Sequence, residues 1–471
     1  MPIPVIIIAQ MREWEKVTWA SGQTEAEVIR RVGKCLAEHA LRLTRPDDLI
    51  LILAGKGHNG KDARCAEGHL AQRRVDVIEV KDPAADLTKL EAVLSLQPAL
   101  IIDGLFGIGI NRPLSADWIR FIEMVNRSSA KILAVDVPSG LNGDSGEPQG
   151  AAIRASVTLT VGAPKIGMLS ESGWPFVGRL EVATEVGLIR CPLKSELNWT
   201  LAEDFQGFPP ARAVATHKGT YGHVGIIAGS VGYHGASVLA ARGAQRAQPG
   251  LITLYTQEDA YPPVASQLQA VMVSPWKSDT DFSHYSAILI GPGLAAADLP
   301  DEVKKLTSEL WVKSPAPVIV DASALAWLPS GAVPEKAVRL ITPHPGEAAR
   351  LLGSKSKDVQ SDRLKSLRRL SQRYGNTWVI LKGHETLVGR SNGDVFVNSS
   401  GNPHLAQGGS GDLLSGYLAG LFAQAALQND PSKTIRYAVW QHGTAADRLH
   451  GRGPNWVVED LVEELGREAP V

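Results

Sequence analysis

An aspartate, Asp412, stands in the stretch HLAQGGSGDLLSGYLAG (residues 404–420), directly after a run of glycines and before an apolar helical pattern. Aspartate at the start of a helix often serves only to cap free backbone N–H groups and to complement the helix dipole. Glycines, however, let backbone N–H groups approach a phosphate closely, at a helix end that already favours anions. A carboxylate among such donors can act as a general base toward a hydroxyl in phosphoryl transfer. The stretch alone is therefore consistent with either a helix cap or a phosphoryl-transfer site.

Four further segments in the second half of the chain combine polar residues with the ends of expected strands. They are THKGTYGHVGIIAGSVGYHGA (216–236), GPGLA (291–295), TPHPGE (342–347) and LKGHET (381–386). Taken singly, they indicate no more than turn glycines, a loop histidine and a solvated lysine. Open α/β sheets bind ligands at the carboxyl ends of their strands. The order and completeness of the set therefore favour one composite site.

The first half of the chain has its own polar segments at expected strand ends. LAGKGHNGKDARCAEGHLA (53–71) leads from a strand into a helix, as phosphate-binding glycine loops do. DGLFGIGINRPL (103–114) and DVPSGLNGDSG (136–146) each place an acid at a strand end, followed by turn residues. Tight turns with capping acids are the alternative explanation of these segments.

These polar segments need a scaffold, and the chain supplies one by alternating short apolar runs with amphipathic stretches. The apolar runs predict strands at residues 48–55, 75–81, 99–107, 130–140, 155–165, 223–230, 251–257, 286–293, 317–325, 340–347 and 378–383. The amphipathic stretches predict helices at 24–43, 116–126, 235–248 and 362–375. The alternation stops near Cys191, and no strand is convincing in the residues that follow. We therefore expect two α/β domains, 1–190 and 205–471, joined by a linker at 191–204.

Composition and charge exclude several classes of protein. The 471 residues carry a formal net charge of -1, whereas nucleic-acid-binding domains usually have a clear basic excess. Three separated cysteines form no pattern typical of a disulfide framework or a zinc site, which fits a reducing compartment. No apolar run approaches the roughly 20 residues needed to cross a bilayer, and the first residues do not resemble a signal peptide. We therefore expect a cytoplasmic protein with small-molecule partners and no nucleic-acid or membrane partner.

In the second half, HKG-x-x-G, GS-x-x-x-x-GA, GPGL, TPHPGE, LKG-x-x-T and GGSGD follow one another in this order. The set resembles the ADP- or ATP-dependent NAD(P)H-hydrate dehydratase family, which has a ribokinase-like fold. The resemblance implies a nucleotide site at Lys382, Gly383, His384, Glu385, Thr386 and Gly411. It implies a site for the hydrated dinucleotide at Ala236, Gly293, His344 and Asp412. Two departures are DASAL (321–325), where the family tends to have a second acid, and Gln407, where a threonine is common.

The resemblance gives Asp412 a chemical role. The hydrated dinucleotide carries a hydroxyl on its nicotinamide ring, and phosphorylation turns this poor leaving group into a good one. Asp412 is expected to accept the hydroxyl proton while backbone N–H groups of residues 409–411 stabilise the transferring oxygens. The ring nitrogen then expels phosphate and restores NAD(P)H. ADP or ATP is the expected phosphoryl donor, and Mg²⁺ the expected ion bridging its phosphates.

The N-terminal segments, together with AQMREWE near the start and GAPKIGM (162–168), resemble the NAD(P)H-hydrate epimerase family. This resemblance covers residues 1–190 and implies a Rossmann-like three-layer sandwich. It implies K⁺ ligands at Asn59, Asp103 and Ser139. It implies substrate contacts at His58, Asn59, Gly60, Lys61, Asp62, Gly107, Ile108, Gly109, Ile110, Asn111, Arg112, Pro113 and Asp136. Asp136 is the candidate acid/base at the carbon being inverted.

One departure affects the loop after the first of these strands. The family pattern Asn-Asn-Gly-Gly-Asp-Gly is replaced by HNGKDA at residues 58–63. The two lost glycines restrict close backbone approach to a pyrophosphate, although the charge of Lys61 can offset the loss. The loop therefore leaves two hypotheses for the N-terminal half, a live epimerase or a non-catalytic binding or assembly module.

We expect a bifunctional enzyme, acting as a homo-oligomer, that interconverts the R and S hydrates NADHX and NADPHX and dehydrates the S form. A third hypothesis makes the chain a ribokinase-like kinase for a vitamin precursor alcohol. That hypothesis would not explain the attached epimerase-like half.

Overall fold

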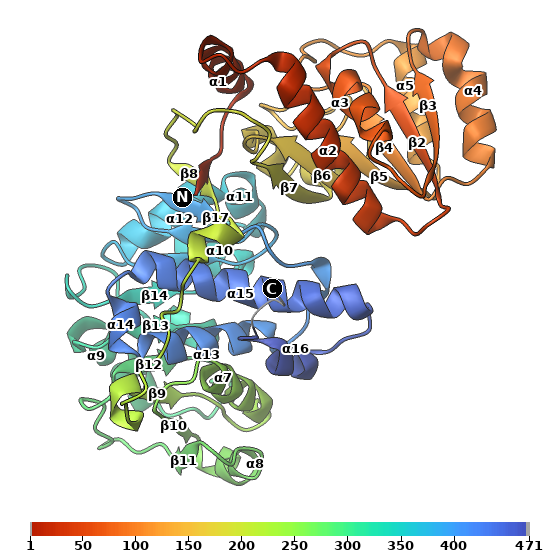
Figure 1. Cartoon of the computed structure of the whole chain (residues 1–471). Coiled ribbons are helices and arrows are strands. Elements are labelled where there is room, and N and C mark those ends of the chain that lie inside the picture. The colour runs from red at the N-terminus through yellow and green to blue at the C-terminus, as the bar shows by residue number, and fades with distance from the viewer. Residues whose placement is uncertain (1, 468–471) are drawn as a thin grey trace. The chain divides into compact units, whose positions relative to one another are not determined.

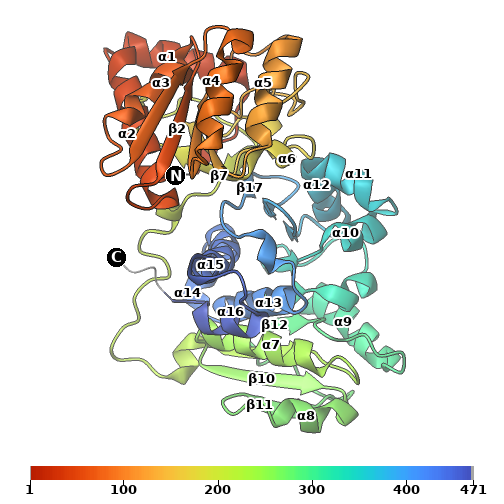
Figure 2. The same cartoon turned by 90° about the vertical axis from the view of Figure 1, so that its right-hand side faces the viewer.

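The computed structural model describes residues 2–467, which form two compact units (Figures 1 and 2). The N-terminal unit is Ile3–Ser195, and the C-terminal unit begins at Glu196. The division lies within the segment 191–204 where the sequence predicts a linker. Each unit is an α/β structure with its own sheet, as the sequence predicts.

The N-terminal unit contains a sheet with the strand order β3-β2-β4-β5-β6-β7, and all neighbours are parallel. The strands of this part of the chain are β1 (Ile3–Pro4), β2 (Leu49–Ala54), β3 (Arg74–Glu79), β4 (Leu100–Gly104), β5 (Lys131–Val135), β6 (Val157–Val161) and β7 (Arg179–Ala183). The helices are α1 (Ile8–Ala20), α2 (Glu25–Leu43), α3 (His58–Glu67), α4 (Pro83–Ser95), α5 (Ala116–Asn126) and α6 (Trp174–Val177).

Helices cover both faces of this sheet because its central strands are apolar on both sides. In β2, Ile50 and Ile52 belong to one buried cluster with residues of α2 and α3. Leu51 and Leu53, which point to the opposite face, belong to another cluster with residues of α4 and α5. Both clusters are buried, so the unit has three layers (Figure 1). The predicted Rossmann-like three-layer sandwich is confirmed.

The strand order also fixes where a ligand can enter this unit. From β2 the chain adds β3 on one side and then crosses to β4 on the other side of β2. Such a reversal opens a crevice at the carboxyl ends of the two strands where the order switches. The loops after β2 and β4, residues 55–57 and 105–115, begin at this crevice.

The C-terminal unit contains a larger sheet whose order is β8-β17-β16-β15-β14-β13-β12-β9-β10-β11. The strands are β8 (Leu197–Trp199), β9 (His223–Ile227), β10 (Leu251–Thr256), β11 (Met272–Pro275), β12 (Ala287–Ile290), β13 (Val318–Val320), β14 (Arg339–Ile341), β15 (Trp378–Leu381), β16 (Leu387–Gly389) and β17 (Val395–Val397). The run from β14 to β11 is parallel, whereas β16 is antiparallel to both of its neighbours.

Helices α7, α13, α15 and α16 share one buried apolar cluster with the strands of this sheet. The helices of the unit are α7 (His234–Arg246), α8 (Tyr261–Ala265), α9 (Asp301–Lys313), α10 (Pro345–Leu352), α11 (Ser356–Ser361), α12 (Arg363–Arg373), α13 (Ser410–Phe422), α14 (Ala425–Gln428), α15 (Pro431–Arg452) and α16 (Val458–Glu464). Helix α13 packs closely on α7 at Gly416. A Cβ atom at this position would lie 1.9 Å from the carbonyl oxygen of Ala240, so only glycine fits there. This contact fixes the position of the helix that carries Asp412.

One segment differs from the sequence expectation. Strand β8 lies in the region after Cys191 where the sequence indicates no strand, and it pairs in parallel with β17. It has three residues, with Leu197 and Trp199 buried and Asn198 between them. So short an alternation gives almost no periodic signal, and pairing with β17 decides the conformation.

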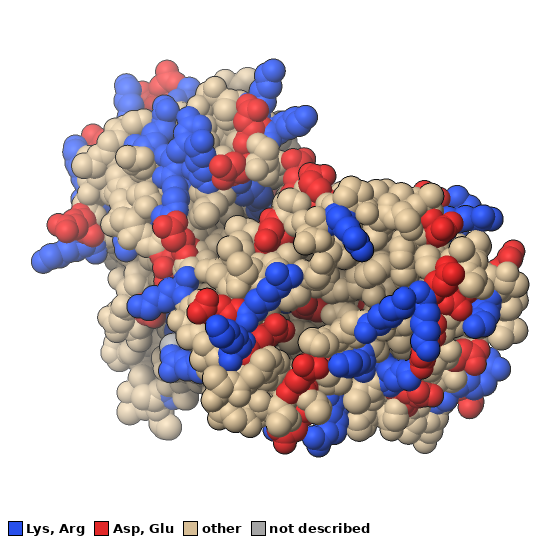
Figure 3. All heavy atoms as spheres, turned by 90° about the horizontal axis from the view of Figure 1, so that it is seen from above, with Lys and Arg blue, Asp and Glu red and all other residues tan. Residues whose placement is uncertain are grey.

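Basic and acidic side chains both occur across the molecular face shown in Figure 3. This mixture agrees with the near-neutral formal charge of the chain. Helices long and apolar enough to cross a bilayer are absent from residues 2–467.

Candidate active sites

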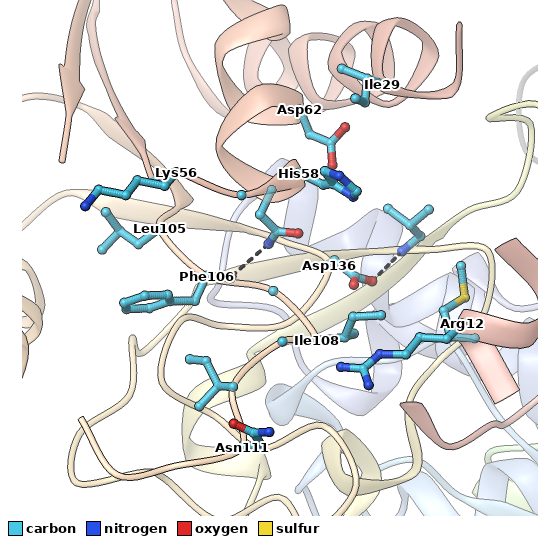
Figure 4. Close-up of a pocket in the computed structure, with 18 of the residues that line it drawn as sticks. Arg12, Ile29, Lys56, His58, Asp62, Leu105, Phe106, Ile108, Asn111 and Asp136 are labelled. Atoms are coloured by element: carbon cyan, nitrogen blue, oxygen red, sulfur yellow. Dashed lines mark hydrogen bonds between the residues drawn. The ribbon is translucent and has the colours of Figure 1, made fainter. Parts of the chain in front are cut away.

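A cavity of about 1080 Å³ opens in the N-terminal unit at the crevice of its sheet (Figure 4). The loops after β2, β4 and β5 contribute to its wall, together with α1, α2 and α3. Of the residues that the sequence predicts for the substrate, the wall includes His58, Asn59, Asp62, Gly107, Ile108, Gly109, Ile110, Asn111, Arg112, Pro113 and Asp136. Residues from three separate sequence segments therefore meet in one cavity.

Gly60 and Lys61 are not part of this wall. A Cβ atom on Gly60 would lie 2.0 Å from the carbonyl oxygen of Gly55, so Gly60 packs against the turn itself. The Lys61 side chain is exposed, and its Nζ lies 3.3 Å from Glu25 Oε1. Ala63, the other residue that replaces a family glycine, is fully buried in the core of the unit. Neither replacement places a side chain in the cavity.

Helix α1 contributes residues to the cavity wall for which the sequence predicts no role. Met11, Arg12, Glu15 and Trp19 line the cavity and lie at helical spacing on one face of this helix. That spacing within the AQMREWE region is the signal that could have identified them. Burial raises the pKa of Glu15, and the negative charge of Asp136 adds to the rise.

The predicted K⁺ ligands Asn59, Asp103 and Ser139 lie together, and Asn59 is part of the cavity wall. Ser139 donates to both carboxylate oxygens of Asp103, from its backbone N at 2.9 Å and from its hydroxyl at 2.6 Å. The amide nitrogen of Asn59 donates to the carbonyl oxygens of Phe106 at 2.8 Å and Val135 at 2.6 Å. Burial raises the pKa of Asp103 to about 6. Carboxylate, hydroxyl and carbonyl oxygens thus meet the amide group of Asn59 within one buried cluster.

Asp136 is held in place by a buried network. Its carboxylate Oδ1 forms an ion pair with Lys165 and accepts hydrogen bonds from Thr160 Oγ1 at 3.1 Å and Val161 N at 3.0 Å. Its backbone has φ of 65°, which non-glycine residues rarely adopt, so the surroundings must enforce this conformation. The Lys165 side chain is fully buried. Although GAPKIGM was noted in the sequence, no role was assigned to its lysine there.

Asp62 differs from Asp136 in having no such partners. It projects from α3 and is 8% exposed, and no donor in the described part of the chain hydrogen-bonds to its carboxylate. Burial raises the pKa of Asp62 well above the usual value, and the carboxylates of Asp136, Glu15 and Glu25 raise it further. The cavity thus contains one paired and one unpaired buried carboxylate.

In the C-terminal unit, Asp412 lies in the first turn of α13. The helix is preceded by Gly409, which has φ of 93°, and no side chain caps it. Within residues 2–467, no backbone N–H donates to the Asp412 carboxylate, so the carboxylate does not cap the helix. Burial raises its pKa to about 7, and the charges of Asp321 and Glu347 contribute to the rise while Lys382 opposes it. A base with this pKa is suited to accept a proton near neutral pH.

Lys382, one of the predicted nucleotide residues, interacts electrostatically with Asp412. Its Nζ lies 2.9 Å from Asp321 Oδ1 and 3.2 Å from the position that a Cβ on Gly411 would occupy. Burial lowers the pKa of Lys382, but the charges of Asp321 and Glu347 outweigh this effect and raise it overall. Asp321 is thus part of the cluster, although the sequence analysis noted its segment only as a departure from the family pattern.

The loop after β15, residues 382–386, is anchored by Arg363 of α12. This buried guanidinium donates to the carbonyl oxygens of Leu381 at 3.1 Å and Lys382 at 3.5 Å, and also to that of His384. The hydroxyl of Thr386 turns back to donate to the carbonyl oxygen of Gly383 at 2.9 Å. The predicted residues Gly383, His384, Glu385 and Thr386 therefore form one ordered turn beside Lys382.

The remaining predicted residues are Gly293, after β12, Ala236, in the first turn of α7, and His344, before α10. A Cβ atom on Gly293 would lie 3.0 Å from that of Ala236, so these two residues lie together. His344 begins α10, where its ring Nδ1 accepts from the backbone N of Gly346 at 3.1 Å. The backbone N of Lys382 donates to the carbonyl oxygen of Pro343 at 2.9 Å, which joins the His344 segment to the Lys382 turn.

Comparisons with known proteins match both units. The sequence profile described as NAD(P)H-hydrate dehydratase matches residues 224–467, and that described as YjeF-related protein N-terminus matches residues 78–167. A bifunctional NAD(P)H-hydrate repair enzyme from Coxiella burnetii is 32% identical over 94% of this chain and 94% of its own length.

Solved structures match the C-terminal part of the chain. An ADP/ATP-dependent NAD(P)H-hydrate dehydratase from Bacillus subtilis is 30% identical, with a TM-score of 0.49 over 54% of this chain and 91% of that chain. A ribokinase-like superfamily protein from Enterococcus faecalis is 24% identical, with a TM-score of 0.51 over 59% of this chain and 97% of that chain. The latter likeness confirms the predicted ribokinase-like fold.

Proposed function

This chain belongs to the family of bifunctional NAD(P)H-hydrate repair enzymes, and we propose that its two activities use the two clusters described above. The cavity of the N-terminal unit interconverts the R and S hydrates. The cluster at the start of α13 dehydrates the S hydrate at the expense of ADP or ATP. The observation that carries the second assignment is Asp412, a half-buried carboxylate that does not cap the helix and whose pKa is raised to about 7.

In the dehydration step, Asp412 accepts the proton of the ring hydroxyl as this oxygen attacks the terminal phosphorus of the nucleotide. Ser410 N donates to the carbonyl oxygen of Gln407 at 3.4 Å. The next backbone N–H groups of α13, those of Gly411 and Asp412, have no partner within the helix and are proposed to meet the transferring oxygens. The phosphorylated oxygen then leaves as phosphate with the C–O electron pair, while the ring nitrogen's lone pair forms a C=N⁺ bond. Loss of a proton from the neighbouring ring carbon to solvent then forms the C=C bond of NAD(P)H and returns the lone pair to nitrogen. Ala236, Gly293 and His344 are proposed to border the hydrated ring.

The nucleotide is proposed to lie along the turn 382–386 and against Gly411. Lys382 supplies positive charge beside the carboxylate that must act as base, and the 382–386 turn presents backbone groups held by Arg363. Mg²⁺ suits this site because the nucleotide phosphates supply the oxygen ligands that it prefers. Bound there, the ion would neutralise charge on the phosphates.

For the N-terminal site, we propose that K⁺ is held by Asn59, Asp103 and Ser139. The cluster offers hard oxygen atoms, which suit an alkali cation. The amide nitrogen of Asn59 faces two carbonyl oxygens in this structure. A half-turn of the amide group about the Cβ–Cγ bond would turn Oδ1 toward the cluster instead. Bound K⁺ would hold the loop after β4 against the carboxyl end of β2.

The altered loop at residues 58–63 is compatible with a live epimerase. Lys61 is directed to Glu25 and Ala63 to the core, so neither replacement narrows the cavity. Asp136 keeps its buried ion pair at the cavity wall. These observations favour the catalytic hypothesis over a module that only binds or assembles.

The test is interconversion of purified R and S hydrates by the full-length protein without nucleotide, since dehydration then cannot proceed. Chromatographic separation of the two forms should show conversion well above the spontaneous rate, and replacing K⁺ with Na⁺ should slow it. Binding of hydrate with conversion at the spontaneous rate would instead support the non-catalytic module.

We also propose a cytoplasmic location, which three free cysteines support. Homo-oligomerisation stays a prediction, and light scattering on the purified protein measures it.

A further inference from the structure

The N-terminal cavity contains two acidic side chains in different settings. Asp62 comes from α3 and Asp136 from the loop after β5 (Figure 4). Asp136 shares its Oδ1 with an ammonium, a hydroxyl and a backbone N–H. Asp62 is 8% exposed and lines the cavity, and its carboxylate receives no hydrogen bond from any described residue. A buried carboxylate without donors is costly as an anion, so a functional explanation is required.

We propose that Asp62 donates the proton to the departing hydroxyl during epimerisation, and that Asp136, held by Lys165, accepts the proton of the water that replaces it. This inference rests on the proposed epimerase function of the cavity. It adds a second acid/base group to the single one, Asp136, that the sequence indicates. Lys165 acts as a positioning residue, because it fixes the acceptor and stabilises its negative charge.

The bond changes balance in two steps. In the first, the ring hydroxyl takes the proton of Asp62, the C–O bond breaks with its electron pair leaving on water, and the ring nitrogen's lone pair forms a C=N⁺ bond. In the second, water adds to the opposite face of this carbon, the C=N⁺ pair returns to nitrogen, and the water proton passes to Asp136. Exchange with solvent then returns a proton to Asp62 and removes one from Asp136. The reverse conversion uses the same two groups in exchanged roles.

The surroundings of Asp62 favour the protonated form that this role requires. Burial raises its pKa well above the ordinary value, and the carboxylates of Asp136, Glu15 and Glu25 raise it further. Lys61, the cation that opposes this rise, is exposed and paired with Glu25. A pair of carboxylates whose environments differ in this way is a recurrent arrangement for acid and base roles.

The experiment uses the full-length protein with purified R-NADHX or S-NADHX, without nucleotide and in K⁺ buffer. Asp62→Asn should lower kcat for interconversion by about 10² or more, the usual contribution of a positioned acid. KM should change little, because asparagine keeps the size and hydrogen-bonding capacity of the side chain. Glu67→Gln, which removes an exposed carboxylate from the same helix, is the matched control and should leave kcat unchanged.

Two further readouts separate proton donation from binding. The wild-type rate of interconversion should fall at high pH as Asp62 loses its proton, and Asp62→Asn should lack this fall. In H₂¹⁸O, each inversion by the wild-type protein should introduce one labelled oxygen into the hydrate. Because this measurement uses only the wild-type protein, its result does not depend on whether a variant folds. Dehydration of S-NADHX with ATP should be retained by Asp62→Asn, which reports that the chain is folded.

The possible failures are distinguishable. A wild-type protein that never exceeds the spontaneous rate would refute the proposed epimerase function itself. An active wild-type protein would overturn the role of Asp62 if Asp62→Asn kept its kcat, or if only KM rose. Inversion without ¹⁸O incorporation would overturn the loss and return of water.

Discussion

At the scale of single residues, the two proposed sites contain carboxylates that differ in their hydrogen-bond partners. The carboxylate of Asp136 is surrounded by donors, whereas the carboxylates of Asp62 and Asp412 receive no hydrogen bonds from the residues described. Elevated pKa values follow for the two unpartnered groups. The first is suited to supply a proton, and the second, with a pKa of about 7, to accept one.

The role of Asp412 predicts how dehydration responds to pH. Because the base must be ionised, kcat/KM for S-NADHX with ATP should increase as pH rises through about 7 and then level off. Asp412→Asn should lower turnover by about 10² or more and remove this dependence, while nucleotide binding persists. Stopped-flow or steady-state recording of the return of NADH absorbance measures both effects. Near-normal turnover in the variant would refute the assignment.

Through its family resemblance, the sequence predicts Asp412 and Asp136 as acid/base groups and Asp62 as a substrate contact. It does not show which of these carboxylates have hydrogen-bond partners. Asp136 pairs with Lys165, and the charges of Asp321 and Glu347 raise the pKa of Asp412, but these partners lie far away in the sequence. Arg12 and Glu15 went unassigned because helical spacing shows which residues share a face but not that this face borders a cavity.

At the scale of elements, the strands that end in polar loops were predictable, because buried parallel strands are long apolar runs. All six residues of β2 are buried, and its register with β3 and β4 brings the loops after β2 and β4 together. The three-residue strands β8, β16 and β17 were not predicted, since so few residues carry no periodic signal. Tertiary pairing, not local preference, defines them.

Helix α12 lies outside the proposed nucleotide site, but its Arg363 anchors the turn that follows β15. Arg363→Met on α12 would remove the donor to the carbonyl oxygens of Leu381 and Lys382. Without these hydrogen bonds the turn is less ordered, and ATP binding should lose about 1.4 kcal/mol of free energy. This loss should raise KM for ATP on the order of tenfold, with KM for the hydrate unchanged. Arg369→Met, at an exposed position of the same helix, is the matched control.

Initial-rate measurements with each substrate varied in turn give both KM values. If KM for the hydrate rose and that for ATP did not, the nucleotide and hydrate subsites would be exchanged. Circular dichroism checks that Arg363→Met still folds, because its guanidinium is buried.

At the scale of the whole molecule, the chain combines two α/β units, each with its own sheet and its own cluster of acidic groups. The two activities are complementary, since one unit supplies the S form that the other consumes. The sequence indicated this pairing from the order of its motifs, and the division at Ser195 lies within the expected linker. The hypothesis of a kinase for an unrelated alcohol does not explain why the chain has the N-terminal cavity.

The central claim, that one chain carries both activities at separate sites, is tested most directly with pure R-NADHX and ATP. The wild-type protein should restore NADH faster than spontaneous epimerisation allows. Asp136→Asn should restore NADH from R-NADHX only at the spontaneous rate but act normally on S-NADHX. Asp412→Asn should fail with both hydrates yet still interconvert them. Equal loss of both activities in each variant, with both variants folded, would contradict two separate sites.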